Sequence, residues 1–152
     1  MKRVYNFNAG PSPMPLEVLE TMKNDLTDFK GTCMGITEIS HRSKEFQDML
    51  DETKALLREL MHLDDDYEIV FIQGGGTMQF LMTAYNFLHT RAAYADTGVW
   101  AHKARNSAAF FGEAYDANSA ADRNYSYIPD TYEVKPGTDY LYLCANNTIY
   151  GT

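Results

Sequence analysis

The run of three glycines at residues 74–76, followed by Thr77, is the first stretch of this chain that could bind a ligand. Glycine has no Cβ, so a turn built from it lets another group approach the backbone closely. The turn precedes a segment with helical apolar spacing, and the free N–H groups at a helix N-terminus attract anions. We therefore expect the N–H groups of Gly76 and Thr77, with the Thr77 hydroxyl, to hold a phosphate. The pattern is neither a Walker A loop nor GxGxxG, and a tight strand-to-helix turn is the simpler alternative.

Trp100 is the only tryptophan, and it lies early in a predicted helix just after a predicted strand. A flat aromatic side chain at the mouth of a sheet is suited to stacking on a planar heteroaromatic ring. The alternative is that Trp100 only packs in the core or on the surface.

Two further groups of polar residues lie at the ends of predicted elements. His41 and Arg42 stand at a helix start, and the arginine fork suits a carboxylate or a phosphate. Asn146, Asn147 and Thr148 follow a predicted strand. In the plainer alternative Arg42 is solvated and the three polar residues only form a turn.

Apolar periodicity predicts the elements that position these residues. Helices are expected over residues 16–29, from Ser43 to about Leu60, from Thr77 and over 99–111. Strands are expected over residues 68–72, 92–96, 113–118 and 140–145. In the first helix one apolar face is marked by Leu16, Leu19, Met22, Leu26 and Phe29. In the second helix the residues expected to point inward are Phe46, Leu50, Leu57 and Leu60. Alternating strands and helices predict an α/β fold with a mainly parallel sheet flanked by helices, which collects ligands at the carboxyl ends of its strands.

The composition and charge of the chain argue against some classes of binding partner. The chain has 152 residues, a formal net charge of -8 and a pI near 4.8, which argue against nucleic-acid and anionic-membrane partners. We expect no signal peptide, because no apolar region follows Lys2 and Arg3, and no stretch nears the ~20 residues of a membrane span. Cys33 and Cys144 have no metal-binding spacing, so we expect reduced thiols, no metal site and a cytoplasmic location.

Five blocks of the chain together resemble the phosphoserine aminotransferases, a family of class V, fold-type I transaminases that use pyridoxal 5′-phosphate. The blocks are NFNAGPSPMP, ITEISHRSKEF, FIQGGGTMQF, DTGVWA and CANNTIYG, in the family's order and spacing. The resemblance implies that Gly76 and Thr77 cradle the cofactor phosphate and that Trp100 stacks on the ring. It also implies that Thr148 bonds the cofactor's phenolic oxygen.

The resemblance further implies that Arg42, with His41, contacts the substrate anion, reaching the neighbouring subunit's site in a homodimer. Two positions depart from the family pattern: Thr77 stands where some relatives place Arg, and Met78 where Gly is common. A cationic contribution to substrate binding at position 77 is therefore lost.

The chemistry of this family needs a Schiff-base lysine and an acidic residue on the pyridine nitrogen. None of the lysines occupies the family's context, and both groups are expected beyond Thr152; the lysines are Lys2, Lys23, Lys30, Lys44, Lys54, Lys103 and Lys135. We interpret residues 1–15 as an N-terminal arm and 16–152 as an incomplete large cofactor-binding domain, without the small C-terminal domain. The chain by itself is therefore expected to be a truncated, inactive piece.

The implied reaction of the complete enzyme is transamination of 3-phosphohydroxypyruvate by L-glutamate to O-phospho-L-serine and 2-oxoglutarate, in serine biosynthesis. Two alternatives stay open: another class V enzyme such as an alanine–glyoxylate aminotransferase, or a non-catalytic fragment that acts as a binding or assembly module. In the resembled fold, segment 68–72 and the three later strands lie on opposite sides of one sheet. We therefore expect 68–72 to lack a partner here, residues 140–145 to form an open edge, and the isolated chain to aggregate, stay molten or depend on a partner.

Overall fold

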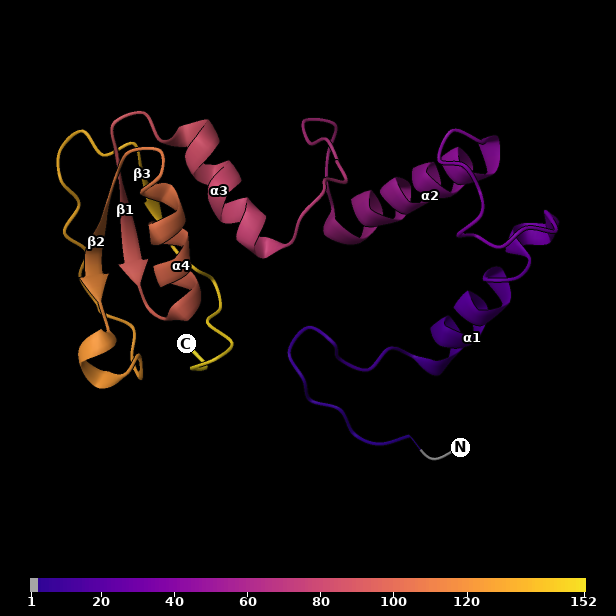
Figure 1. Cartoon of the computed structure of the whole chain (residues 1–152), viewed down its shortest axis with the longest axis horizontal. Coiled ribbons are helices and arrows are strands. Elements are labelled where there is room, and N and C mark those ends of the chain that lie inside the picture. The colour runs from indigo at the N-terminus through magenta and orange to yellow at the C-terminus, as the bar shows by residue number, and fades with distance from the viewer. Residues whose placement is uncertain (1–2) are drawn as a thin grey trace. The chain divides into compact units, whose positions relative to one another are not determined.

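The computed structural model describes residues 3–152, which divide into two compact units (Figure 1). The first unit ends at Phe71, and the second comprises Ile72–Thr152. Each unit is described by itself.

The first unit is helical and contains no strand among its described residues. It consists of α1 (Leu16–Asp25), a short 3-10 helix η1 (Phe29–Gly31) and α2 (Lys44–Met61). The Ser43 side chain caps α2 by accepting the N–H of Phe46 at 3.3 Å, and His62 ends the helix in the left-handed conformation.

The helix predicted over residues 16–29 is shorter than expected, and its apolar face is largely exposed. It stops at Asp25 because the following residues fold back, with the N–H of Phe29 donating to the carbonyl oxygen of Met34 at 2.8 Å. Phe29 is buried, but Met22 and Leu26 are each about half exposed and Leu60 of α2 is 75% exposed. The expected inward position is therefore wrong for Leu60, while Phe46, Leu50 and Leu57 of α2 are half-buried.

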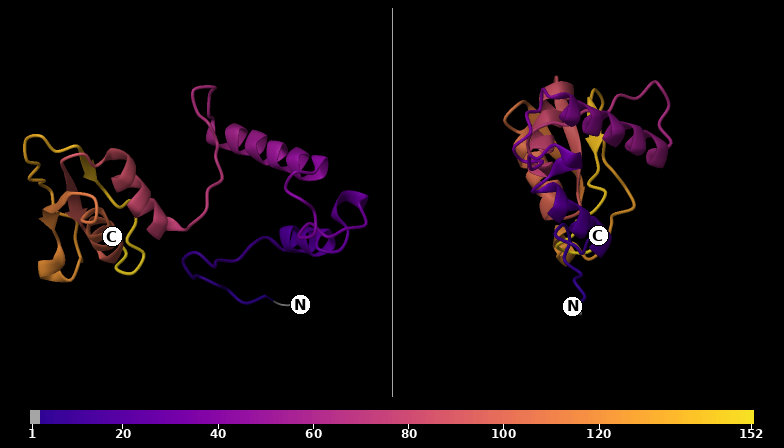
Figure 2. Two further views of the ribbon diagram at one scale, coloured as in Figure 1. Left: turned by 45° about the horizontal axis from the view of Figure 1, so that its top comes forward. Right: turned by 90° about the vertical axis from the view of Figure 1, so that its right-hand side faces the viewer.

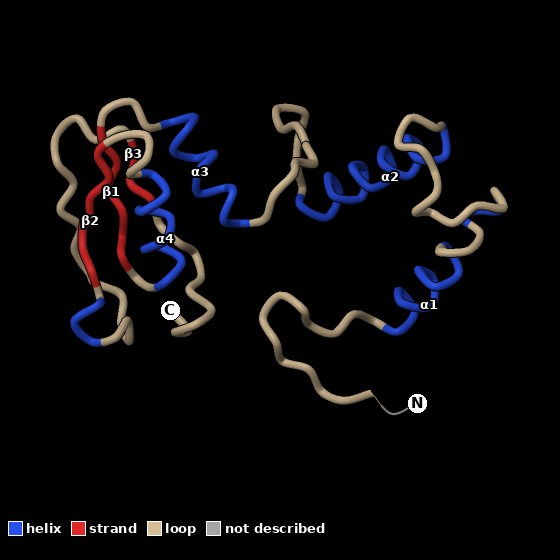
Figure 3. Tube along the Cα trace, in the orientation of Figure 1, coloured by secondary structure: helices blue, strands red, loops and turns tan. Residues whose placement is uncertain are grey.

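The strand predicted over residues 68–72 is absent, and Figure 3 shows loop between α2 and α3. The side chains of Val70, Phe71 and Ile72 are all more than half exposed. An apolar β-branched run is compatible with a strand, but a strand exists only where another backbone supplies hydrogen-bond partners. Among residues 3–152, the one sheet consists of β1, β2 and β3 and does not include this segment.

The second unit is an α/β unit whose helices alternate with parallel strands (Figures 1 and 2). Its elements are α3 (Gly76–Phe87), β1 (Arg91–Asp96), α4 (Val99–Ala108), β2 (Glu113–Ser119), a 3-10 turn η2 (Ala121–Arg123) and β3 (Tyr140–Tyr142). The strands lie in the order β2-β1-β3, and both pairings are parallel. The predicted parallel α/β arrangement is confirmed, and β3 forms an open edge as expected.

Two elements of this unit end earlier than predicted. Helix α4 stops at Ala108 rather than 111 because the N–H groups of Phe110 and Phe111 donate to carbonyl oxygens three residues back, those of Ser107 and Ala108, instead of four. Strand β3 stops at Tyr142 rather than 145, because its pairing with β1 ends there, opposite Tyr94. The chain after β3 is thereby released into the loop that carries residues 146–148.

The core of the second unit is made mostly of alanines. Small side chains on β1 and α4 allow the helix to pack closely on the sheet. Tyr94 is the one large side chain that is fully buried there besides Asn147, and its hydroxyl lies 2.7 Å from that of Tyr140. Burial raises the pKa of the Tyr94 hydroxyl far above its ordinary value, so it stays neutral.

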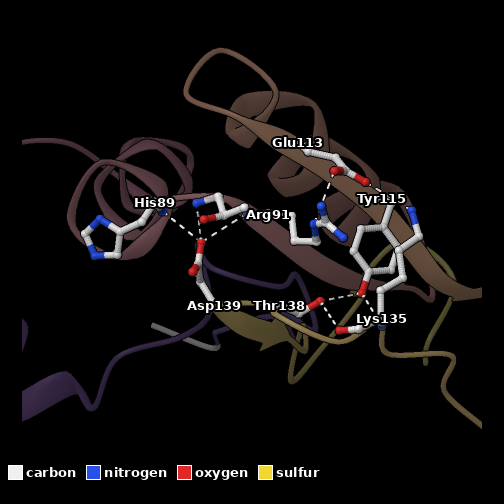
Figure 4. A network of polar contacts seen from close by, with 8 residues as sticks. His89, Arg91, Glu113, Tyr115, Lys135, Thr138 and Asp139 are labelled. Atoms are coloured by element: carbon white, nitrogen blue, oxygen red, sulfur yellow. Dashed lines mark hydrogen bonds and ion pairs between the residues drawn. The ribbon is translucent and has the colours of Figure 1, made fainter.

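At the amino ends of the strands a single carboxylate holds the start of β1 (Figure 4). Asp139 Oδ2 accepts the backbone N–H groups of His89, Thr90 and Arg91 at 2.8, 2.6 and 3.1 Å. These hydrogen bonds, that of Thr90 foremost, hold the pKa of Asp139 below its ordinary value. The Arg91 guanidinium also pairs with Glu113 of β2 at 3.3 Å. These contacts stabilise the amino end of the sheet, which is opposite the end where ligands are expected.

Candidate active site

The N-terminus of α3 presents unpaired backbone donors. Gly75 occupies the N-cap position, and no side chain caps the helix. Within residues 3–152, the N–H groups of Gly76 and Thr77 have no acceptor, whereas the N–H of Met78 donates to the carbonyl oxygen of Gly75 at 2.9 Å. Two N–H groups and the positive end of the helix dipole are thus available to an anion.

The three glycines have different roles in this turn. Gly74 has φ +95°, and a Cβ there would lie 2.6 Å from the Cβ of Met78, so the chain itself requires glycine at this position. A Cβ at Gly75 or Gly76 would meet no atom within 4 Å. The open space at these two positions is room for a ligand beside the donors.

Trp100 lies at the second position of α4, just after the carboxyl end of β1, and its ring is held at two points. Its indole N–H donates to the Thr148 hydroxyl at 3.1 Å. The Lys103 ammonium lies 4.7 Å from the ring centroid, within range of a cation–π contact. The loop after β3 and the start of α4 are therefore connected through the predicted stacking residue.

A pocket of about 320 Å³ joins the helix terminus, the tryptophan and the loop after β3. Its lining residues are Gly76, Thr77, Phe80, Trp100, Cys144 and Asn146. None of the six carries a charge, so this wall provides backbone donors, aromatic surface, an amide and a thiol. The structure thus brings Gly76, Thr77 and Trp100 together, with Thr148 bonded to Trp100 beside them.

Two lining residues were missed as site residues by the sequence analysis. Phe80 was not singled out from the apolar residues of the predicted helix, and Cys144 was considered only as a reduced thiol. Phe80 lies four residues after Gly76, and residues at this spacing share one helix face, so the sequence contained a signal for it. For Cys144 the position next to a polar strand end was the only signal.

His41 and Arg42 lie in the first unit, directly before α2, and both are exposed. The Gln47 side chain donates to the carbonyl oxygen of His41 at 2.6 Å, and the N–H of Arg42 donates to the Ser40 hydroxyl at 3.3 Å. These contacts shape the loop backbone, and a substrate role for the two side chains stays a prediction.

Comparison with known proteins assigns the family. The sequence model for the class-V aminotransferases matches residues 4–152. The chain belongs to this family. Phosphoserine aminotransferase of Bacteroides thetaiotaomicron is 46% identical over 148 residues, which are 97% of this chain and 42% of that protein.

Solved structures agree with this class-V assignment. A phosphoserine aminotransferase structure from a study of radiation damage to its Schiff base has a TM-score of 0.90 and 41% identity, covering 99% of this chain and 44% of that one. A phosphoserine aminotransferase of Trichomonas vaginalis solved with bound PLP has a TM-score of 0.86 and 31% identity. The match covers 97% of this chain and 46% of that one. The prediction of a fold-type I portion with a parallel sheet is confirmed.

The chain spans about 42% of the length of the curated class-V relatives that it matches. Among residues 3–152, none of the helices has the length and apolar character that crossing a membrane requires.

Proposed function

We propose that the complete protein carrying this chain is a pyridoxal-phosphate-dependent transaminase that converts 3-phosphohydroxypyruvate and L-glutamate into O-phospho-L-serine and 2-oxoglutarate. The observation that carries this proposal is the pocket that is lined both by Gly76 and Thr77, at the uncapped N-terminus of α3, and by Trp100. Identity of 46% to a phosphoserine aminotransferase over 97% of the chain supports the choice of substrate.

The residues present fit the cofactor. The unpaired N–H groups of Gly76 and Thr77 would hold its phosphate, since the uncharged wall leaves the dianion to backbone donors and the helix dipole. The indole of Trp100 would cover one face of its pyridine ring. When bound, the cofactor supplies an electron sink for removal of a proton from the amino-acid substrate.

Thr148 is prepared to donate a hydrogen bond. Its hydroxyl oxygen accepts the indole N–H of Trp100 at 3.1 Å, and within residues 3–152 its own proton has no acceptor. A hydroxyl provides one donor and two acceptor sites, so that proton is free for the cofactor's phenolic oxygen. The same bond holds the Trp100 ring in a fixed orientation.

The remaining catalytic groups belong to the rest of the complete protein in this proposal. No lysine and no carboxylate lines the pocket in the described part of the chain. We infer that the Schiff-base lysine and the acid on the pyridine nitrogen come from sequence beyond Thr152, that residues 1–15 are an N-terminal arm, and that residues 16–152 are part of the large cofactor-binding domain. The chain alone is then inactive.

The proposal includes a cytoplasmic homodimer in which His41 and Arg42 contact the anionic group of a substrate. Both side chains are exposed just before α2 and available to an anion. Arginine suits a phosphate or carboxylate because its guanidinium donates two parallel hydrogen bonds.

The test is a substrate comparison with the complete protein. We expect turnover with L-glutamate and 3-phosphohydroxypyruvate in the presence of pyridoxal phosphate, and kcat/KM at least ~100-fold lower with L-alanine and glyoxylate. The reverse preference would favour the alanine–glyoxylate alternative. Absence of turnover with both pairs, together with no cofactor binding, would favour a binding or assembly module.

A further inference from the structure

Asn147 is the polar side chain most completely removed from solvent in the described part of the chain. It has no exposed surface, while the other buried polar residues, Asp96 and Thr97, retain about 5–6%. A buried amide must find hydrogen-bond partners within the protein, so its contacts fix its position.

The partners of this amide lie on the other loop of the candidate site. Asn147 Nδ2 donates to the Thr97 hydroxyl at 3.0 Å, and the N–H of Ala101 approaches Asn147 Oδ1 at 3.5 Å. The side chain from the loop after β3 therefore contacts both the turn after β1 and the first turn of α4. Those contacts lie on either side of Trp100 in the sequence.

The backbone of Asn147 organises its own loop. Its N–H donates to the carbonyl oxygen of Thr152, and its carbonyl oxygen accepts the N–H groups of Tyr150 and Gly151 at 3.0 and 2.9 Å. The Thr152 hydroxyl donates in turn to the carbonyl oxygen of Thr97 at 2.9 Å. Thr148 is held inside this turn, next to Asn147.

Gly98 shows how closely the two loops approach. A Cβ at this position would lie 2.6 Å from both Cγ and Oδ1 of Asn147. Atoms that close overlap, so glycine is required where the Asn147 side chain covers the turn. Gly98, two residues before Trp100 in the sequence, therefore packs directly against the side chain of Asn147.

We propose that Asn147 is a positioning residue that fixes the ring of Trp100 relative to the hydroxyl of Thr148. Asn147 does not line the pocket, and it acts by holding the turn of Thr97 and Gly98 against the loop that carries Thr148. That this geometry serves pyridoxal phosphate rests on the proposed function. The positioning of Trp100 itself does not depend on the cofactor.

The experiment uses the complete protein labelled with 5-fluorotryptophan, with the Trp100 resonance assigned by its loss in Trp100→Phe. Asn147→Ala is compared with Tyr94→Phe, which removes another buried hydrogen-bonding group from the same unit. We expect Asn147→Ala to shift or broaden the Trp100 resonance without cofactor and to raise the dissociation constant of pyridoxal phosphate at least ~10-fold. Tyr94→Phe should lower the melting temperature but leave both readouts unchanged.

Thr97→Val provides a second, milder variant should Asn147→Ala fail to fold. This substitution removes the acceptor of the Asn147 amide with little change of shape. As a single substitution it should shift the Trp100 resonance, and in the Asn147→Ala background it should cause little further shift. An unchanged Trp100 resonance in the folded Asn147 or Thr97 variant would overturn the inference. A shifted resonance in a protein that binds no pyridoxal phosphate would uphold the inference and refute the proposed function.

Discussion

The indole N–H of Trp100 donates to the hydroxyl of Thr148 at 3.1 Å, across 48 residues of sequence. This bond joins the first turn of α4, which follows β1, to the loop after β3 at the carboxyl edge of the sheet. In an α/β fold that edge is where ligands bind. The relationship leaves the Thr148 proton free and orients the ring.

Thr148→Val in the complete protein should therefore weaken cofactor binding by about 1 kcal/mol, or roughly fivefold in dissociation constant. The variant loses both the acceptor for Trp100 and the donor for the cofactor's phenolic oxygen. Thr148→Ser should restore affinity, and Thr21→Val, at an exposed threonine bonded within α1, should have no effect. Equal affinities for all four proteins would remove Thr148 from the site.

Thr77→Asp should weaken binding of pyridoxal phosphate without destabilising the fold. A carboxylate beside the cofactor phosphate should raise the dissociation constant of pyridoxal phosphate at least ~10-fold, about 1.4 kcal/mol. The same aspartate lies in the first turn of α3, where it favours the helix dipole, so the melting temperature of the cofactor-free protein should not fall. Thr77→Ser is the matched control and should bind normally. Normal affinity in Thr77→Asp would show that the phosphate lies elsewhere.

Much of this site could be predicted from the sequence, because its signals are local. The glycine turn, Trp100 just after β1 and the polar run after β3 each follow from neighbouring residues. The contact between Gly98 and Asn147 could not be predicted, since it depends on how two loops pack. Segment 68–72 shows the same limit, because a strand needs a partner that local composition does not reveal. That the isolated chain aggregates or stays molten remains a prediction.

Gly98→Ala should destabilise the complete protein more than Gly137→Ala does. Both glycines have positive φ, but a Cβ at Gly137 would meet no atom within 4 Å, while one at Gly98 would overlap Asn147. The overlap should add about 1–3 kcal/mol to the loss in unfolding free energy. Urea denaturation of the two variants measures the difference, and equal losses would show that Asn147 does not pack on this turn.

Asp139→Asn should lower stability in a pH-dependent way. The folded pKa of Asp139 lies below its ordinary value of 3.8, owing to the N–H groups of Thr90 and His89. The ionised carboxylate therefore stabilises the fold above that ordinary value, and the contribution is lost as pH falls through the lower, folded pKa. The urea midpoint of Asp139→Asn should be below that of the wild type at pH ~7, and the gap should shrink below pH ~4.

The control for this titration is Asp130→Asn, at an exposed aspartate for which no hydrogen bond or ion pair occurs within residues 3–152. Its urea midpoint should follow the wild type throughout. A gap for Asp139→Asn that is the same at both pH values would show that charge on Asp139 does not stabilise the start of β1.

The most direct test of the central claim is a crystal structure of the complete protein grown with pyridoxal phosphate. The account predicts that the cofactor phosphate lies within hydrogen-bond distance of the N–H groups of Gly76 and Thr77, with the pyridine ring against Trp100. It also predicts that the phenolic oxygen accepts a hydrogen bond from Thr148. A cofactor phosphate bound away from the N-terminus of α3, or a ring that does not contact Trp100, would contradict it.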